Sequence, residues 1–207
     1  MKSKKISIVD YNNCNIGSVI NMLRFLEIDY KVCISSKDLL NAEKILLPGV
    51  GSFDEAMKNI KKFGFEDELN NKVLNQNVPI LGICLGMQLI TNSSEEGNEK
   101  GLGWINAETK KLNLDKEFNV PHMGWNTIQI LNNSPIVKNF NENFKFYFVH
   151  SYHVELKDNS NAICKTPYGI NINSIINFKN IFAAQFHPEK SHKYGMQLFK
   201  NFAEIEC

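Results

Sequence analysis

The first half of the chain alternates short apolar runs with amphipathic stretches, and this pattern predicts strands alternating with helices. Lys5–Val9 and Pro79–Ile83 are apolar runs of buried-strand length, whereas Ser18–Leu26 repeats apolar residues three and four positions apart. The expected strands of this half are 5–9, 30–34, 44–48 and 79–83, and the expected helices are 18–26, one capped by Asp54, 65–75 and 85–91. This alternation indicates a parallel sheet covered by helices on both faces.

The second half contains several strand-like runs and ends in one amphipathic helix. The expected strands are 104–114, 126–130, 145–149, 162–166, 170–176 and 181–186, and the expected helix is 194–202. A length of 207 residues supports one sizeable core but not two comfortable domains. We therefore predict a single α/β domain over residues 1–207, with a mixed, mostly parallel central sheet, flanking helices and added antiparallel strands.

Composition excludes several classes of function. The net charge is +1, which favours neither nucleic acid nor a membrane surface as partner. No apolar run approaches the roughly 18 residues of a membrane span, and the first apolar stretch is too short for a signal peptide, so we expect a cytoplasmic protein. The cysteines form an odd, widely spaced set, and the histidines lack ligand spacing, so we expect no disulfide framework, no metal and no cofactor. The cysteines are Cys14, Cys33, Cys84, Cys164 and Cys207.

The segment Gly82–Gly86, of sequence Gly-Ile-Cys-Leu-Gly, lies between an expected buried strand and an expected helix. This is the nucleophile-elbow pattern with cysteine in place of serine. A strand that turns abruptly into a helix strains the backbone of its middle residue, and small residues two positions away relieve the crowding. Cys84 is then a candidate nucleophile, with the Leu85 N–H directed at a developing oxyanion. Taken alone, the pentapeptide is equally compatible with a buried core cysteine.

A thiol nucleophile needs a base and a group that orients the base. His187 directly follows the strand 181–186, and Glu189 is close enough in sequence to accept a hydrogen bond from the imidazole. A lone His-Pro-Glu would be an ordinary surface turn, but beside the cysteine turn it predicts a catalytic triad. The glycines around Val50 in Pro48–Gly51 offer a second oxyanion donor, although this tetrapeptide alone also fits a plain strand-to-helix turn.

Together these motifs resemble the class I (triad) glutamine amidotransferase family. The resemblance implies that Cys84 attacks the side-chain amide of glutamine, that His187 helps ammonia leave, and that water releases glutamate from the thioester. It implies an oxyanion hole at Val50, Gly51 and Leu85. It also implies a glutamine pocket containing Gly51, Gln88, Glu96, Ser151 and Tyr152, with Glu96 facing the α-amino group. Without the resemblance, Glu96 would be taken for a solvated carboxylate at a helix end.

Four further segments resemble the glutaminase subunit of imidazole glycerol phosphate synthase, and the likeness spans essentially the whole chain. These segments are Gly101–Trp104, Val120–Asn126, Tyr147–Tyr152 and Gln185–Ser191. The resemblance implies a heterodimer with a (β/α)8-barrel cyclase subunit, to which ammonia passes for histidine biosynthesis. It implies a docking surface and ammonia gate that include Asn15, Trp125, Asn126 and Lys190. It further implies that the segment around Val50 rearranges to complete the oxyanion hole when partner and acceptor bind.

One segment departs from the family pattern. The first strand usually continues Asp-Tyr-Gly-x-Gly-Asn, but here Asn12 and Cys14 replace both glycines, and His153 follows Tyr152 where two aromatics are common. An alternative is therefore a related glutaminase subunit that supplies ammonia for amidation of a surface-polysaccharide nucleotide sugar. Two alternatives of other classes are a cysteine peptidase-like thiol hydrolase, which would leave Gln88 and Glu96 unexplained, and a silent interaction subunit, against which the intact triad argues.

Overall fold

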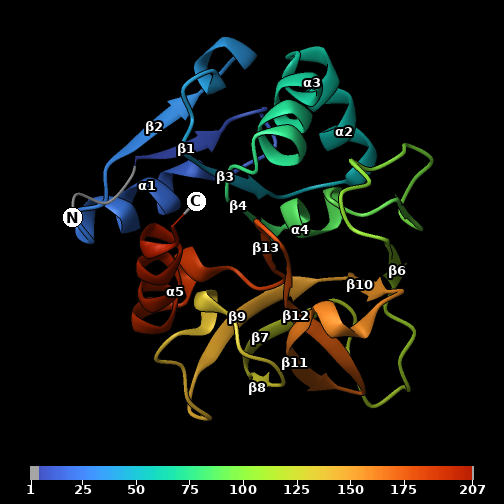
Figure 1. Ribbon diagram of the computed structural model, residues 1–207. Coiled ribbons are helices and arrows are strands. Elements are labelled where there is room, and N and C mark those ends of the chain that lie inside the picture. The colour runs from blue at the N-terminus through green and yellow to red at the C-terminus, as the bar shows by residue number, and fades with distance from the viewer. Residues whose placement is uncertain (1–4, 207) are drawn as a thin grey trace.

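A computed structural model describes residues 5–206, and its centre is an eight-stranded sheet (Figure 1). From one edge to the other the strands are β2 (Tyr30–Cys33), β1 (Ile6–Val9), β3 (Lys44–Gly49), β4 (Ile80–Cys84), β13 (Ile181–Ala184), β12 (Ile170–Phe178), β11 (Ala162–Tyr168) and β8 (Gln129–Ile130). The first five strands are mutually parallel and the last three add antiparallel pairings. The expected mixed, mostly parallel sheet is confirmed.

Two small sheets extend the second half of the chain. One contains β10 (Tyr152–Leu156), β6 (Ala107–Lys111) and β5 (Ser93–Ser94), and the other pairs β7 (His122–Thr127) with β9 (Lys145–His150). Figure 1 places β7, β9 and β10 below the ends of β4 and β13. The small sheets therefore lie where the central parallel strands end, next to the turn that contains Cys84.

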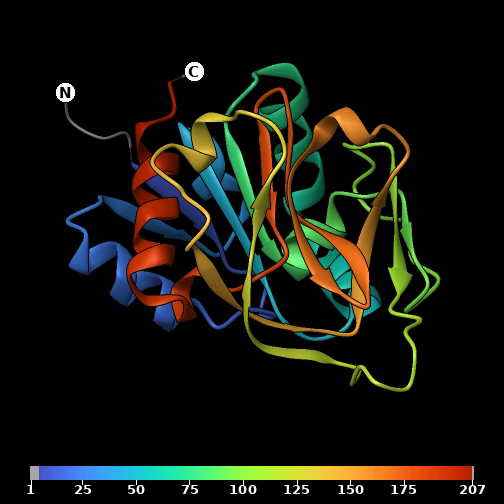
Figure 2. The same ribbon diagram turned by 90° about the horizontal axis from the view of Figure 1, so that it is seen from below.

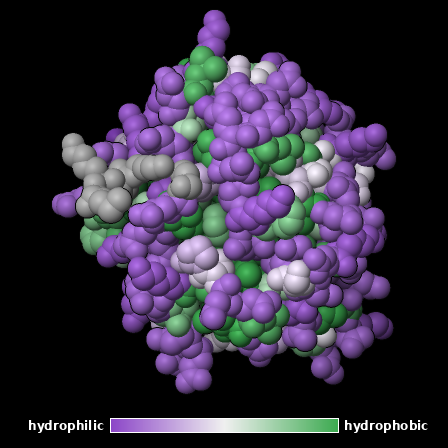
Figure 3. Space-filling model, in the orientation of Figure 1, coloured by the Kyte–Doolittle hydropathy of each residue, from purple (hydrophilic) through white to green (hydrophobic). Residues whose placement is uncertain are grey.

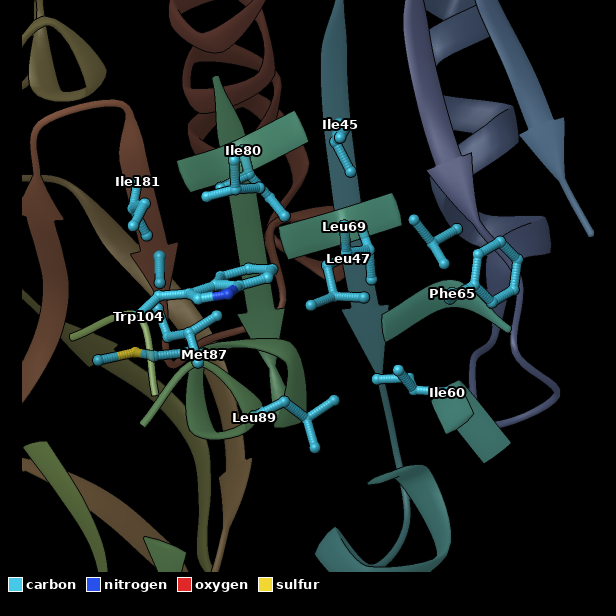
Figure 4. Packing of buried hydrophobic residues seen from close by; sticks show 14 of the residues in the cluster. Ile45, Leu47, Ile60, Phe65, Leu69, Ile80, Met87, Leu89, Trp104 and Ile181 are labelled. Atoms are coloured by element: carbon cyan, nitrogen blue, oxygen red, sulfur yellow. The ribbon is translucent and has the colours of Figure 1, made fainter. Parts of the chain in front are cut away.

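Helices cover both faces of the central sheet (Figure 2). The helices are α1 (Ile16–Phe25), α2 (Phe53–Lys62), α3 (Phe65–Asn70), α4 (Leu85–Leu89) and α5 (His192–Glu204), with short helices at Ser36–Leu39, Asn71–Asn75, Pro135–Val137, Asn159–Asn161 and Pro188–Lys190. The side chains of β3 alternate between two cores: Ile45 and Leu47 pack with α2 and α3 (Figure 4), whereas Leu46 packs with α1 and α5. The visible surface is mostly hydrophilic (Figure 3).

Several predicted elements differ from those of the structure. The strand expected at 104–114 is shorter, since the N–H groups of Gly101–Trp104 donate to carbonyls of residues 89–92 before β6 begins. Strands β5 and β10 and the first half of β7 were not predicted, because β5 has only two residues and β7 alternates exposed Met123 and Trp125 with polar residues. Asp54 is not the cap of α2, which starts at Phe53.

The glycines flanking Cys84 are required by close backbone contacts. A Cβ atom on Gly86 would lie 1.9 Å from the Leu47 carbonyl oxygen, and one on Gly82 would lie 2.7 Å from the Gly86 carbonyl oxygen. These contacts are with backbone atoms, which cannot move aside as the end of a flexible side chain can. A larger residue at Gly86 would therefore push β3 away from α4. These contacts explain why the turn carries a small residue on each side of the cysteine.

We expect Gly86→Ala to lower the free energy of unfolding by about 3 kcal/mol, because the new methyl group meets the Leu47 carbonyl. Gly17→Ala in α1 is the matched control: its Cβ would have only an ordinary contact, at 3.7 Å, and alanine is the better helix former. Urea unfolding followed by circular dichroism measures both. Equal stability of the two variants would contradict the packing argument.

Candidate active site

Cys84 occupies a strained turn at the end of β4. Its backbone angles are φ 53° and ψ −105°, a conformation that side chains other than glycine rarely adopt, and α4 begins at the next residue. The side chain is 7% exposed, and its Sγ atom lies 4.0 Å from the Val149 carbonyl oxygen and 3.9 Å from Gln185 Nε2. The strain and the position at the carboxyl end of parallel strands are those of an elbow nucleophile.

His187 and Glu189 form a buried hydrogen-bonded pair. The distance between His187 Nδ1 and Glu189 Oε1 is 2.6 Å, and the two side chains are 2% and 5% exposed. The backbone around them is fixed by Ser191, whose hydroxyl donates to the His187 carbonyl and accepts from the Tyr147 N–H. The carboxylate therefore orients the imidazole, as the sequence predicted for a base and its orienting group.

The imidazole of His187 also interacts with the thiol of Cys84, and the electrostatics favour its charged form. Burial lowers the pKa of His187, but hydrogen bonds and charge interactions with Cys84 and Glu189 outweigh it and raise the pKa to about 10. A thiolate–imidazolium pair is the arrangement that a cysteine nucleophile requires, and the imidazolium can deliver a proton to a leaving group.

We expect Glu189→Gln to lower the pKa of His187, because it removes one of the two charges that raise it. Since the acid must be protonated, activity falls as pH rises through about 10 in the native protein and at a lower pH in the variant. A raised pKa also stabilises the fold fully below about 6.5, and this stabilisation is lost as pH rises through about 10. An NMR titration of the imidazole gives the midpoint directly; identical midpoints would rule out the carboxylate as a cause.

Cys84 and His187 border a cavity of about 340 Å³, a volume suited to a small metabolite, whereas Glu189 is not among its lining residues. It is lined by Val50, Gly51, Cys84, Leu85, Gln88, Glu96, Pro121, Val149, His150, Ser151, Tyr152, His187 and Lys190. The structure thus brings every predicted oxyanion and glutamine-binding residue to one cavity, together with Lys190 from the predicted docking set.

The backbone at Val50 is engaged elsewhere in this conformation. Its N–H donates to the Asn13 carbonyl at 2.8 Å, and the preceding Pro48 carbonyl accepts from the Tyr11 hydroxyl at 2.9 Å. Gly51 has φ 96°, so the segment relies on glycine. An oxyanion hole that includes Val50 therefore requires this peptide to turn away from Asn13.

Gln185 is a neighbour of Cys84 that the sequence analysis missed. It is fully buried, and its amide lies next to Cys84 and accepts from Gln88 Nε2 at 3.5 Å. Gln88 Nε2 also donates to the Tyr152 carbonyl at 3.2 Å. Gln185 stands two residues before His187, and that spacing on a strand could have indicated a shared face.

Comparison with known proteins identifies the chain. The model of the family described as "Glutamine amidotransferase class-I" matches residues 7–205. The chain belongs to the class I glutamine amidotransferase family. It is 48% identical to "Imidazole glycerol phosphate synthase subunit HisH 2" of Methanococcus maripaludis, with 95% of this chain and 98% of the relative covered. A protein of the same name from Pseudomonas aeruginosa is 44% identical, with 97% and 99% covered.

Solved structures give the same fold. The structure titled "Structure of PurLQS from Thermotoga maritima" superposes with a TM-score of 0.76 at 18% identity, and 98% of each chain is covered. The membership in the amidotransferase family that the sequence motifs predicted is therefore confirmed. In this class I glutamine amidotransferase, Cys84 and His187 line the cavity, and Glu189 is hydrogen-bonded to His187.

Of the four residues predicted for partner docking, Lys190 lines this amidotransferase cavity and the other three do not. Trp125 is 43% exposed and stacks on His192, with ring centroids 5.6 Å apart, so it is not a core tryptophan. The Lys190 ammonium lies 5.8 Å from the centre of the Tyr147 ring. Asn15 is exposed at the start of α1, whereas the Asn126 amide is used internally, donating to the Pro167 carbonyl at 3.0 Å.

The departure from the family pattern at residues 12 and 14 is accommodated locally. Asn12 has φ 68°, a left-handed conformation in which asparagine is the usual substitute for glycine. The Cys14 thiol lies near Asp10 Oδ1 and the Val9 carbonyl, and burial, followed by the Asp10 charge, raises its pKa to about 12. Formation of the reactive thiolate is therefore disfavoured at Cys14, and Cys84 remains the candidate nucleophile.

Two buried histidines were not assigned a role from the sequence. His122 Nδ1 lies 3.0 Å from His150 Nε2, and His150 Nδ1 lies 2.8 Å from the Tyr152 carbonyl, so each ring carries its proton on Nδ1. Burial lowers the pKa of His122 to about 4 and that of His150 to about 3, and both rings are neutral near pH 7. Within residues 5–206 no group of three or more potential ligands could hold a metal ion, and no helix has the length and apolarity of a membrane crossing.

Proposed function

We propose that this chain is the glutaminase subunit of an imidazole glycerol phosphate synthase, with Cys84 as its nucleophile, His187 as its acid and base, and Glu189 as the orienting carboxylate. The observation that carries the proposal is the positive φ of Cys84 at the end of β4, beside a buried His187–Glu189 pair. The names of the two relatives support the choice of synthase. The whole chain, residues 1–207, then acts as one cytoplasmic domain without a cofactor.

The proposed chemistry follows from the groups that border the cavity. The Cys84 thiolate attacks the side-chain amide carbon of glutamine. The Leu85 N–H donates a hydrogen bond to the developing oxyanion, and the Val50 N–H does so too once its peptide has turned. The carbon–nitrogen bond breaks as His187 protonates the leaving ammonia. Water, deprotonated by the now neutral imidazole, then attacks the thioester and releases glutamate and the thiolate.

The substrate is held, in this proposal, by groups on three sides of the cavity. Glu96 pairs with the α-ammonium group, and Ser151 and Tyr152 bind the α-carboxylate side through their backbone and side chains. Gln88 and Gly51 complete the pocket. Ammonia leaves toward a (β/α)8-barrel cyclase that docks over Asn15, Trp125, Asn126 and Lys190.

A second candidate acceptor is supported by two specific observations. The names of both relatives carry the number 2, and another relative from Methanococcus maripaludis, 41% identical, carries the number 1. Asn12 and Cys14 replace glycines in a segment next to the predicted docking surface. The alternative is the same glutaminase chemistry with ammonia delivered to a nucleotide sugar of a surface polysaccharide through a different barrel partner.

The deciding experiment measures glutamate release from glutamine by the purified chain, alone and with the barrel cyclase, each with and without an analogue of the histidine-pathway acceptor. Strong stimulation that requires both additions supports the histidine assignment. Turnover that ignores this acceptor, or that needs another barrel, supports sugar amidation. Absence of glutamate release in every mixture would reject the glutaminase proposal itself.

A further inference from the structure

The start of α2 touches the proposed α-ammonium site at the Glu96 side chain. The Phe53 N–H, in the first turn of α2, donates to Glu96 Oε2 at 2.9 Å. Glu96 also lines the cavity. The helix therefore holds Oε2 of Glu96 in place. The direction in which Oε1 points then depends on the position of the Glu96 backbone.

The next residue of α2, Asp54, binds the backbone that follows Glu96. Asp54 Oδ1 accepts from the N–H groups of Asn98 at 3.0 Å and Glu99 at 2.9 Å, and Oδ2 accepts from Asn98 at 3.1 Å. These hydrogen bonds lower the pKa of the Asp54 carboxyl, and the bond from the Glu99 N–H has the largest effect. A Cβ atom on Gly97 would lie 2.0 Å from Asp54 Oδ1, so only glycine lets the carboxylate approach this closely.

The connections on the other side of Glu96 do not involve α2. Its N–H donates to the Ser94 hydroxyl at 3.1 Å, and the Glu95 N–H donates to the Thr109 carbonyl at 2.9 Å. A further link from α2 to this loop is the ion pair between Lys61 and Glu99, which is partly exposed and contributes little. Asp54 is thus the charged anchor that ties the loop after Glu96 to the same helix turn that binds the Glu96 carboxylate.

We propose that Asp54 is a positioning residue for substrate recognition, which sets the affinity for the α-ammonium group of glutamine by holding Glu96 through the 97–99 backbone. The inference rests on the proposed glutaminase function and on the proposed role of Glu96. It assigns to Asp54 no contact with substrate. Loss of the anchor lets Glu96 move, which weakens binding of the α-ammonium group and leaves the thiol chemistry intact.

The test compares Asp54→Ala and Asp54→Asn with Glu55→Gln, which removes the same charge from an exposed neighbour in the same helix turn. We expect Asp54→Ala to raise KM for glutamine about tenfold with kcat within about twofold, a smaller rise for Asp54→Asn, and no change for Glu55→Gln. Thermal melting confirms that each variant is folded. Gly97→Ala, which expels the same carboxylate without changing it, should reproduce the rise in KM.

A substrate without the α-amino group separates this role from general damage. Glutaramate, the des-amino analogue of glutamine, should be hydrolysed equally by native protein and Asp54→Ala, so the preference for glutamine shrinks about tenfold. In a Glu96→Gln background, Asp54→Ala should have no further effect on KM. Equal losses with both substrates, or additive effects with Glu96→Gln, would overturn the inference. A native protein that releases no glutamate would instead reject the proposed function.

Discussion

Replacement of Cys84 by alanine is expected to lower glutamate release from glutamine by at least about 10⁴-fold, because among residues 5–206 Cys84 is the one thiol that lines the cavity. The strained turn has φ 53° at this residue and presents its side chain to the cavity that contains His187. Alanine keeps the turn and removes only the sulfur. Glutamine should therefore still bind, and the measurement is glutamate formation at saturating glutamine.

Two controls make this result specific to the nucleophile. Ammonia-dependent synthesis by the complex of Cys84→Ala with its barrel partner should stay near the native rate, since free ammonia bypasses the thioester. Cys33→Ala removes a buried thiol of β2 outside the cavity and should leave glutamate release within about twofold of native. Appreciable glutaminase activity in a clean Cys84→Ala preparation would overturn the assignment of the nucleophile.

The second large effect is expected for His187→Asn, which should slow turnover by about 10³- to 10⁴-fold. Asparagine can still hydrogen-bond to Glu189, but it cannot stabilise the thiolate as a cation or carry a proton to ammonia. The native imidazolium does both, because its pKa is raised to about 10 by Cys84 and Glu189 against the opposing effect of burial. Pre-steady-state release of ammonia measures the affected step.

Glu189→Gln provides the graded comparison for this variant. It keeps the imidazole and removes only its orienting charge, so its rate should fall between those of native protein and His187→Asn. If Glu189→Gln were slower than His187→Asn, Glu189 itself would be the proton carrier. That outcome would reverse the roles proposed for the pair.

The residues that the sequence predicted for the active site are those with a local signature. Cys84 stands between two glycines where a strand meets a helix, and both glycines are demanded by backbone contacts within a few residues or with the adjacent strand. His187 and Glu189 follow directly on a buried strand, so their place at the sheet edge follows from chain order. The sequence around such residues is therefore enough to predict their place in the active site.

The residues that the sequence analysis missed act through contacts between distant segments. Asp54 looked like a helix cap, yet its carboxylate binds the backbone 44 and 45 residues away. His150 looked like an unremarkable histidine until the fold placed His122 against it. The first half of strand β7 escaped prediction because β7 belongs to a two-stranded sheet with one exposed side, where its large apolar residues Met123 and Trp125 lie on the exposed side.

The hydrogen bond from the Val50 N–H to the Asn13 carbonyl limits how far the chain by itself can suppress waste of glutamine. One such bond contributes about 1 kcal/mol net, which holds the idle peptide orientation only about fivefold over the alternative. A cell that keeps glutamine abundant would lose nitrogen steadily through an enzyme restrained so weakly. The neighbouring hydrogen bond from the Tyr11 hydroxyl to the Pro48 carbonyl adds to this restraint, and in the proposed complex the partner would have to overcome the restraint to turn the Val50 peptide.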